Sequence, residues 1–227
     1  MIMDKNNVTK LNKCVVAFLI IMSILSFSNI FKLEVKGEPL KLAGLTIIVG
    51  LVAFFVTRKT NDSKQEALDI KTFLPKLKSK KVIVLILVPV VLNIILVFVY
   101  KALMPEYFDF LQSRIPFDLE LAKLKPIFFE STVIPLGEEI AMRAFFQKQT
   151  TKVFGFIPSV IMTSVLFAIG HFSYGAVAIM ILDIGGIFVD SIFYGIIFKE
   201  TDNAWCSWLP HFLADIIVIL LIMVLAL

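Results

Sequence analysis

The stretch that decides the fold is residues 82–103, VIVLILVPVVLNIILVFVYKAL, in which Lys101 is the only charged residue. As a helix it is long enough to cross the hydrocarbon core of a bilayer, which takes about 20 mostly apolar residues. Because lipid offers no hydrogen bonds to the backbone, such a segment spans the membrane as a helix. Further apolar runs cover 14–31, 40–56, 126–146, 156–174, 176–198 and 205–227. The sequence therefore predicts an all-α, polytopic transmembrane helix bundle with about seven spanning helices, or eight.

Composition points the same way. The chain has 227 residues, is 59% hydrophobic and 18% charged, and has a mean hydropathy of +0.91. Soluble domains have roughly 45–50% apolar and about 25% charged residues. The length predicts one membrane domain over 1–227. Because the net charge is only +4 and the basic residues lie beside apolar runs, we expect no nucleic-acid partner.

The loops predict the orientation. The link 58–81 is rich in lysine, and the positive-inside rule places it in the cytoplasm. The N-terminus is then also cytoplasmic, and the first run is an uncleaved anchor. Residues 104–125 alternate polar and apolar side chains, which predicts a short amphipathic segment on the opposite membrane surface.

The run 126–146 carries ionisable side chains where lipid is expected. Such groups cost several kcal/mol in a spanning segment by most estimates, so they are usually functional. Glu139 and Arg143 are four residues apart in the order that favours an ion pair on a helix. Glu138 lies about 100° away around the helix and has no partner on it. A carboxylate left free in this way suits a general base. Pro135 predicts a kink just before the pair.

The only two histidines of the chain also fall in apolar runs. His171 follows Phe167 by four residues, and His211 precedes Asp215 by four, on one helix face. A base and several polar partners from three helices supply the parts of a hydrolytic site. The sequence has no HExxH and no GxSxG, which excludes a one-helix zinc protease and a serine nucleophile elbow. Each residue taken singly has a structural reading at least as good.

The expected boundaries raise a question of depth. They place Glu138 and His211 about 10 Å, but His171 about 20 Å, from the cytoplasmic ends of their helices. A helix beginning near Ser207 would put Pro210 in its first turn, where proline is tolerated. Asp183 and Asp190 share one face of their run, and they either line the same polar cavity or pair with Arg143.

The order EExxxR, FxxxH and HxxxD resembles the CPBP or Abi family, which comprises CAAX proteases and bacteriocin-processing or self-immunity proteins. The resemblance covers 126–227, the expected catalytic core. It implies that Glu138 activates water and that Glu139 and Arg143 support the site. It also implies three groups that bind the oxyanion or a metal: His171, His211 and Asp215. It leaves the cofactor open: a divalent metal such as zinc, if one is bound, is expected at His171, His211 and Glu138.

The resemblance implies an intramembrane glutamate or metallo-endopeptidase that hydrolyses a membrane-associated peptide or protein, including bacteriocin-like peptides. We expect it to be a multi-pass protein of the bacterial plasma membrane. One alternative is a bacteriocin self-immunity or peptide-maturation accessory protein. Another is a non-catalytic membrane scaffold or regulator of the same fold.

Overall fold

The computed structural model describes residues 11–31, 34–35, 38–39, 42–60, 66–114 and 121–226. Parts of two predicted segments, 61–65 of the basic link and 115–120 of the amphipathic stretch, lie outside the described residues.

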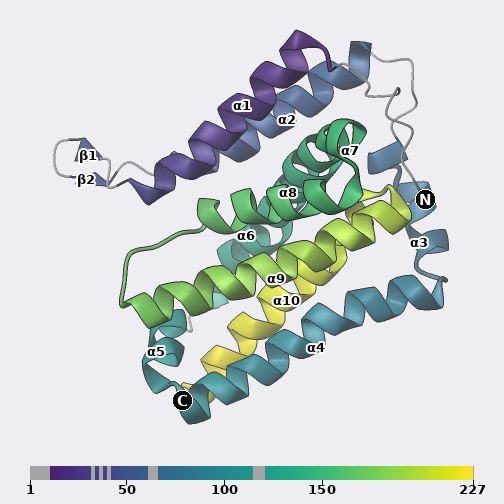
Figure 1. Cartoon of the computed structure of the whole chain (residues 1–227). Coiled ribbons are helices and arrows are strands. Elements are labelled where there is room, and N and C mark those ends of the chain that lie inside the picture. Colours follow the sequence, from purple (N-terminus) through teal and green to yellow (C-terminus); the bar gives the residue numbers. More distant parts are fainter. Residues whose placement is uncertain are drawn as a thin grey trace.

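The described chain is helical apart from a short antiparallel pair of strands, β1 (Glu34–Val35) and β2 (Glu38–Pro39). The first half contains α1 (Lys13–Phe27), the 3-10 turn η1 (Ser28–Ile30), α2 (Ala43–Thr60), η2 (Glu66–Leu68), α3 (Ile70–Lys76), α4 (Lys80–Leu103) and α5 (Pro105–Ser113). The second half contains α6 (Leu121–Glu139), the π-helical η3 (Ile140–Gln147), α7 (Lys148–Phe154), α8 (Phe156–Gly170), α9 (Val177–Thr201) and α10 (Ala204–Leu225). Figure 1 shows these elements side by side as a helix bundle.

Each apolar run coincides with a helix, which confirms the all-helical prediction. Helices α4, α9 and α10 are long and apolar enough to cross a membrane, and α1, α2 and α8 are shorter apolar helices. The protein is therefore an integral membrane protein, and the count of seven or eight spans stays a prediction. The amphipathic prediction corresponds in part to α5, which follows α4 directly.

The last helix begins one residue before the expected run 205–227, and not near Ser207. Helix α10 begins at Ala204 because Asn203 caps it, its Oδ1 accepting a 2.9 Å hydrogen bond from the Trp205 amide. Pro210 therefore lies inside the helix, where its missing N–H leaves the carbonyl of Cys206 without its usual helical donor.

The bundle has two distinct ends. At the α3 end, Lys76 donates to the Thr201 carbonyl, and Lys148 pairs with Asp202 at 2.6 Å. At the α5 end, the turn after α1 meets the end of α8, where the Asn29 amide donates to the carbonyl of Gly170 at 3.0 Å. Helix α4 connects the two ends, since it begins just after α3 and stops just before α5. The depth of each site residue in the bundle can be measured from these two ends.

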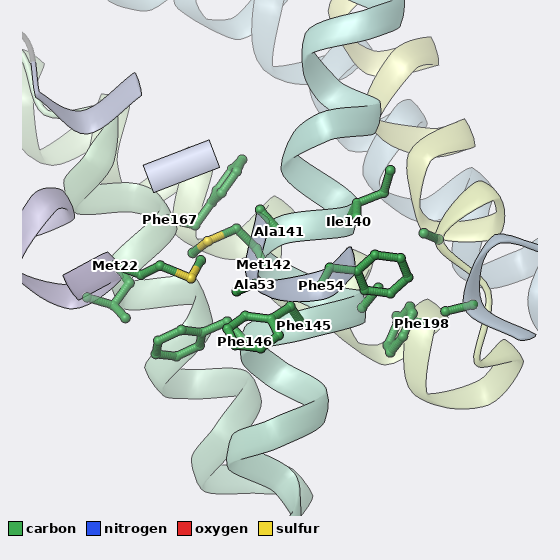
Figure 2. Packing of buried hydrophobic residues seen from close by; sticks show 14 of the residues in the cluster. Met22, Ala53, Phe54, Ile140, Ala141, Met142, Phe145, Phe146, Phe167 and Phe198 are labelled. Carbon is green, nitrogen blue, oxygen red and sulfur yellow. The ribbon is translucent and has the colours of Figure 1, made fainter. Parts of the chain in front are cut away.

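The core lies where α1 and α2 pack against η3, and every residue of η3 is buried. Figure 2 shows Met22 of α1 and Phe54 of α2 close to Ala141 and Phe145 of η3. Helix α6 continues through Pro135 without a break, and the kink expected there stays a prediction. A distortion follows Glu139 as the wider turns of a π-helix, a feature often found at functional sites.

Gly50 on α2 allows this close approach and provides a stability test. A Cβ at Gly50 would lie 2.4 Å from the Cβ of Ala141 and 2.9 Å from its Cα. We expect Gly50→Ala to lower the free energy of unfolding in detergent by about 1–3 kcal/mol, since overpacking forces backbone shifts. Gly185→Ala on α9, where an added Cβ meets nothing within 4 Å, is the control. It should be neutral or slightly stabilising, as alanine favours helix. Equal effects would contradict tight packing at Gly50.

Candidate active site

The centre of the site is the junction of α6 and η3, where Glu138 and Glu139 lie. Glu139 pairs with Arg143, Oε1 to Nη1 at 3.2 Å, and both side chains are fully buried. The predicted ion pair is therefore confirmed. Nη1 of Arg143 and Oε2 of Glu139 nevertheless lack a well-aligned hydrogen-bond partner among the described residues, so the pair acts mainly by charge.

Glu138 meets its partners on other helices. The Nε2 atom of His171 lies 3.6 Å from its Oε1, and the Nε2 atom of His211 lies 3.6 Å from its Oε2. These distances exceed those of direct hydrogen bonds, so both imidazoles face the carboxylate across a narrow gap. The Glu138 side chain is 10% exposed, and one edge of it lines a cavity.

His171 lies at the end of α8 rather than inside a spanning helix. His171 is the C-cap residue of α8, and its Nδ1 is 2.8 Å from the carbonyl oxygen of Phe167. Because a carbonyl only accepts, Nδ1 carries the proton and Nε2 is directed at Glu138. The Phe167 ring packs against the imidazole with centroids 4.6 Å apart. The following loop is held by Asn29, which donates to the carbonyl of Phe172 at 2.8 Å.

His211 is held on two sides. Its Nδ1 is 3.2 Å from Oε1 of Glu139, the oxygen that also pairs with Arg143, so Nδ1 donates to this carboxylate oxygen. The ring of Tyr194 stacks on the imidazole at 4.7 Å with an interplanar angle of 19°. The second glutamate thus connects the buried arginine to the second histidine. It fixes which way the imidazole of His211 points.

Asp215 is the most open member of the set, with a side chain 40% exposed. Its Oδ2 lies 3.8 Å from Nε2 of His211, which is an ion-pair distance but too long for a hydrogen bond. The structure thus brings all six predicted site residues together: Glu138, Glu139, Arg143, His171, His211 and Asp215.

The question of depth has its answer in the length of the helix that carries Glu138. This helix does not end at 146 but continues through η3 and α7. Glu138 and His171 therefore both lie roughly 20 Å from the hairpin that joins α7 to α8. The ion pair between Lys148 and Asp202 places the start of α7 level with the start of α10. The hairpin at the other end of α7 therefore lies farther from the site than the start of α10 does. His211, about 10 Å into α10, then meets the other two at one level.

The residues expected to hold a metal have suitable orientation but not suitable spacing. Both imidazoles are anchored through Nδ1 and present Nε2, as metal-binding histidines usually do. Across the described ranges, however, no three His, Cys, Asp or Glu side chains form a group that could hold a metal ion. The arrangement of these described residues does not fit a metal.

A large cavity of about 420 Å³ extends from Glu138 between α4, α9 and α10 towards α5. Asp183 and Asp190 both line this cavity, which confirms one of the two alternatives predicted for them. The alternative, pairing with Arg143, is wrong. Asp183 pairs with Arg114 at 2.8 Å, and Asp190 accepts from Asn93 at 2.9 Å.

Tyr107 of α5 lines the large cavity. Burial, and then the negative charge of Asp183, raises the pKa of the Tyr107 hydroxyl above its ordinary value. The hydroxyl therefore stays protonated and can donate to that carboxylate. Tyr107 also makes an edge contact with Tyr100 of α4, with ring centroids 4.6 Å apart.

Sequence reasoning missed several residues that hold the site. Tyr194, Ser191 and Asn29 are ordinary residues in apolar or loop segments, and no spacing marks them. Ser191 accepts a hydrogen bond of 2.8 Å from Nη2 of Arg143. Ser191 and Tyr194 are three residues apart on one face of α9, the only signal that could have joined them.

Comparison with known proteins agrees with the site. The sequence model of a family described as type II CAAX prenyl endopeptidase Rce1-like matches residues 121–217. This segment includes all six residues of the site, and it confirms the resemblance to the CPBP or CAAX protease family. At the level of the family, the match supports an intramembrane protease. No curated protein and no solved structure gave a significant match.

Proposed function

We propose that the protein is an intramembrane endopeptidase in which Glu138 activates water to hydrolyse a peptide bond of a membrane-delivered peptide or protein. The observation that carries the proposal is the approach of two imidazole Nε2 atoms to the two oxygens of one carboxylate, each at 3.6 Å. A water molecule or a substrate carbonyl in the large cavity beside the carboxylate would lie within reach of all three groups. The large cavity, at about 420 Å³, has the size of a typical ligand site.

The proposed reaction uses Glu138 twice. The carboxylate removes a proton from water as the water oxygen bonds to the carbonyl carbon, which gives a tetrahedral intermediate with a negative oxygen. Collapse of the intermediate re-forms the C=O bond and breaks the C–N bond. Glu138 then returns its proton to the leaving nitrogen. The products are a carboxylic acid and an amine, and the Glu138 carboxylate is regenerated.

His171 and His211 would stabilise the negative oxygen. When protonated on both nitrogens, each imidazole donates from Nε2 into the same gap, where the charge develops in the transition state. In that state the site is neutral overall, with three cationic side chains against three carboxylates: Arg143, His171 and His211 against Glu138, Glu139 and Asp215. The structural role of the Glu139–Arg143 pair is then to hold His211 in place.

Orientation and location form part of the proposal. Lysines gather at the α3 end, so we place that end and the N-terminus in the cytoplasm of a bacterium, with α5 at the opposite surface. The family description names a CAAX prenyl endopeptidase, but the acidic side chains along the large cavity are not what a prenyl chain requires.

The test is hydrolysis of single-span reporter peptides by the protein in liposomes, with products identified by mass. We expect His171→Ala to lower kcat/KM by about 10²-fold, because one donor to the developing negative charge is lost. The neighbouring Ser173→Ala is the matched control and should stay within about twofold of the wild type, an effect under 1 kcal/mol. Both variants should insert and purify as the wild type does.

The alternatives make different predictions in cells. A scaffold or regulator would still complement a deletion after His171→Ala, and this result would refute the enzyme. If the protein provides self-immunity, cells that lack its gene should be sensitive to a peptide encoded near that gene. No contact in the site favours either of these functions over hydrolysis.

A further inference from the structure

Glu138 and His171 form a partition between two cavities. On one side lies the large cavity. On the other lies a small cavity of about 220 Å³ between α1, α2, η3 and α8. Both cavities are lined by Glu138, Phe167 and His171. A group bound at Glu138 therefore has space on both sides of it.

The two cavities differ in chemistry. Apart from the shared residues, the small cavity is lined by Ser26, Gly44, Thr46, Ile47, Met142, Leu166 and Gly170, none of them charged. Its two hydroxyls face each other, with Oγ of Ser26 and Oγ1 of Thr46 3.5 Å apart. The large cavity carries Arg114 and several carboxylates. A charged side chain in the small cavity would lose its hydration and, beyond the shared Glu138 and His171, would find no ion-pair partner among the lining residues.

The size of the small cavity also limits its occupant. A cavity of about 150 Å³ lined by apolar side chains can bind benzene. At about 220 Å³, the small cavity has room for one side chain with a ring or a branched chain, but not for several residues. A peptide advances at most about 3.6 Å per residue, so the side chains that flank a bond held at Glu138 are close enough to reach a cavity that borders this residue.

We propose that the small cavity is the binding subsite for the side chain on one side of the cleaved bond, and that Gly44 of α2 sets its size limit. The occupant is an uncharged side chain. The proposal rests on the proposed function, because it needs a bond cleaved at Glu138. It assigns a role in specificity to α1 and α2, which lie outside the matched segment 121–217.

The glycines provide matched variants. Gly44 lines the small cavity, Gly186 lines the large one, and Gly185 lines neither. At each of the three, an added Cβ meets nothing within 4 Å, so a larger side chain can be introduced without a clash at the Cβ. Gly44→Leu fills the small cavity, Gly186→Leu intrudes on the large one, and Gly185→Leu controls for the substitution itself.

The experiment first maps the bond that the wild type cleaves in a single-span reporter peptide. It then places Ala, Leu, Phe or Lys at each residue flanking that bond. We expect Gly44→Leu to reduce kcat/KM at least tenfold for Leu and Phe at one flanking position, and by less than threefold for Ala. Gly186→Leu should not reproduce this pattern, and Gly185→Leu should match the wild type.

A protection measurement covers the case in which Gly44→Leu fails to fold. In a Glu138→Gln, Cys14→Ser background, which removes the exposed cysteine, Gly44→Cys is labelled with a maleimide. The peptide with Leu at the flanking position should slow labelling, and the peptide with Lys should not. Unchanged specificity in Gly44→Leu, or labelling that no peptide slows, overturns the subsite while the wild type still cleaves. If the wild type cleaves no reporter peptide, the proposed function fails and the subsite with it.

Discussion

Replacement of Glu138 by glutamine is expected to lower kcat/KM for peptide hydrolysis by up to about 10⁴-fold, the range of general acid–base catalysis. Glutamine has nearly the same shape but cannot take a proton from water. The side chain is 10% exposed and faces two imidazoles across gaps of 3.6 Å, so its removal affects the reacting atoms directly. Kinetics with the reporter peptide in liposomes measure the effect.

The matched control for this variant is Glu130→Gln. Glu130 lines the same large cavity from α6, but among the described residues no ion pair or hydrogen bond joins it to the catalytic set. It should stay within a few-fold of the wild type. Full activity in Glu138→Gln would remove the proposed base, and equal losses in both variants would point to the charge of the cavity instead.

Replacement of Arg143 by methionine is expected to destabilise the fold by about 3–5 kcal/mol, because it leaves a buried carboxylate without its partner. Arg143 and Glu139 are both 0% exposed, and Oε2 of Glu139 already lacks a hydrogen bond. The guanidinium also lies 4.7 Å from the ring of Phe167 and 5.5 Å from that of Tyr194. The free energy of unfolding in detergent or bicelles is the measurement.

Two further variants separate the effect of charge from that of packing. Glu139→Gln combined with Arg143→Met removes both charges and should recover part of the lost stability, since no unpaired ion remains. Lys148→Ala breaks the exposed pair with Asp202 and should cost at most about 1 kcal/mol. If Arg143→Met behaved like Lys148→Ala, the buried pair would have no special weight in the fold.

The prediction of a helical membrane protein depended on local properties, and it succeeded for that reason. Long apolar runs form helices in lipid whatever they pack against, because the backbone must satisfy itself. The pairing of Glu139 with Arg143 succeeded for a similar reason, since residues four apart on one helix are neighbours. The helix ends were less accurate, as at Ala204 and Phe154, because caps and turns decide them.

By itself, the sequence determined the helical bundle, the ion pair and the residues of the candidate site, all of which follow from spacing within single segments. Only the tertiary structure decided that His171 and His211 meet at Glu138, because contacts between helices depend on how long each helix runs and where it packs. It likewise decided that Asp183 pairs with Arg114, and that α1 and α2 close a second cavity beside the carboxylate. These are contacts across long sequence separations, which no periodicity within one helix encodes.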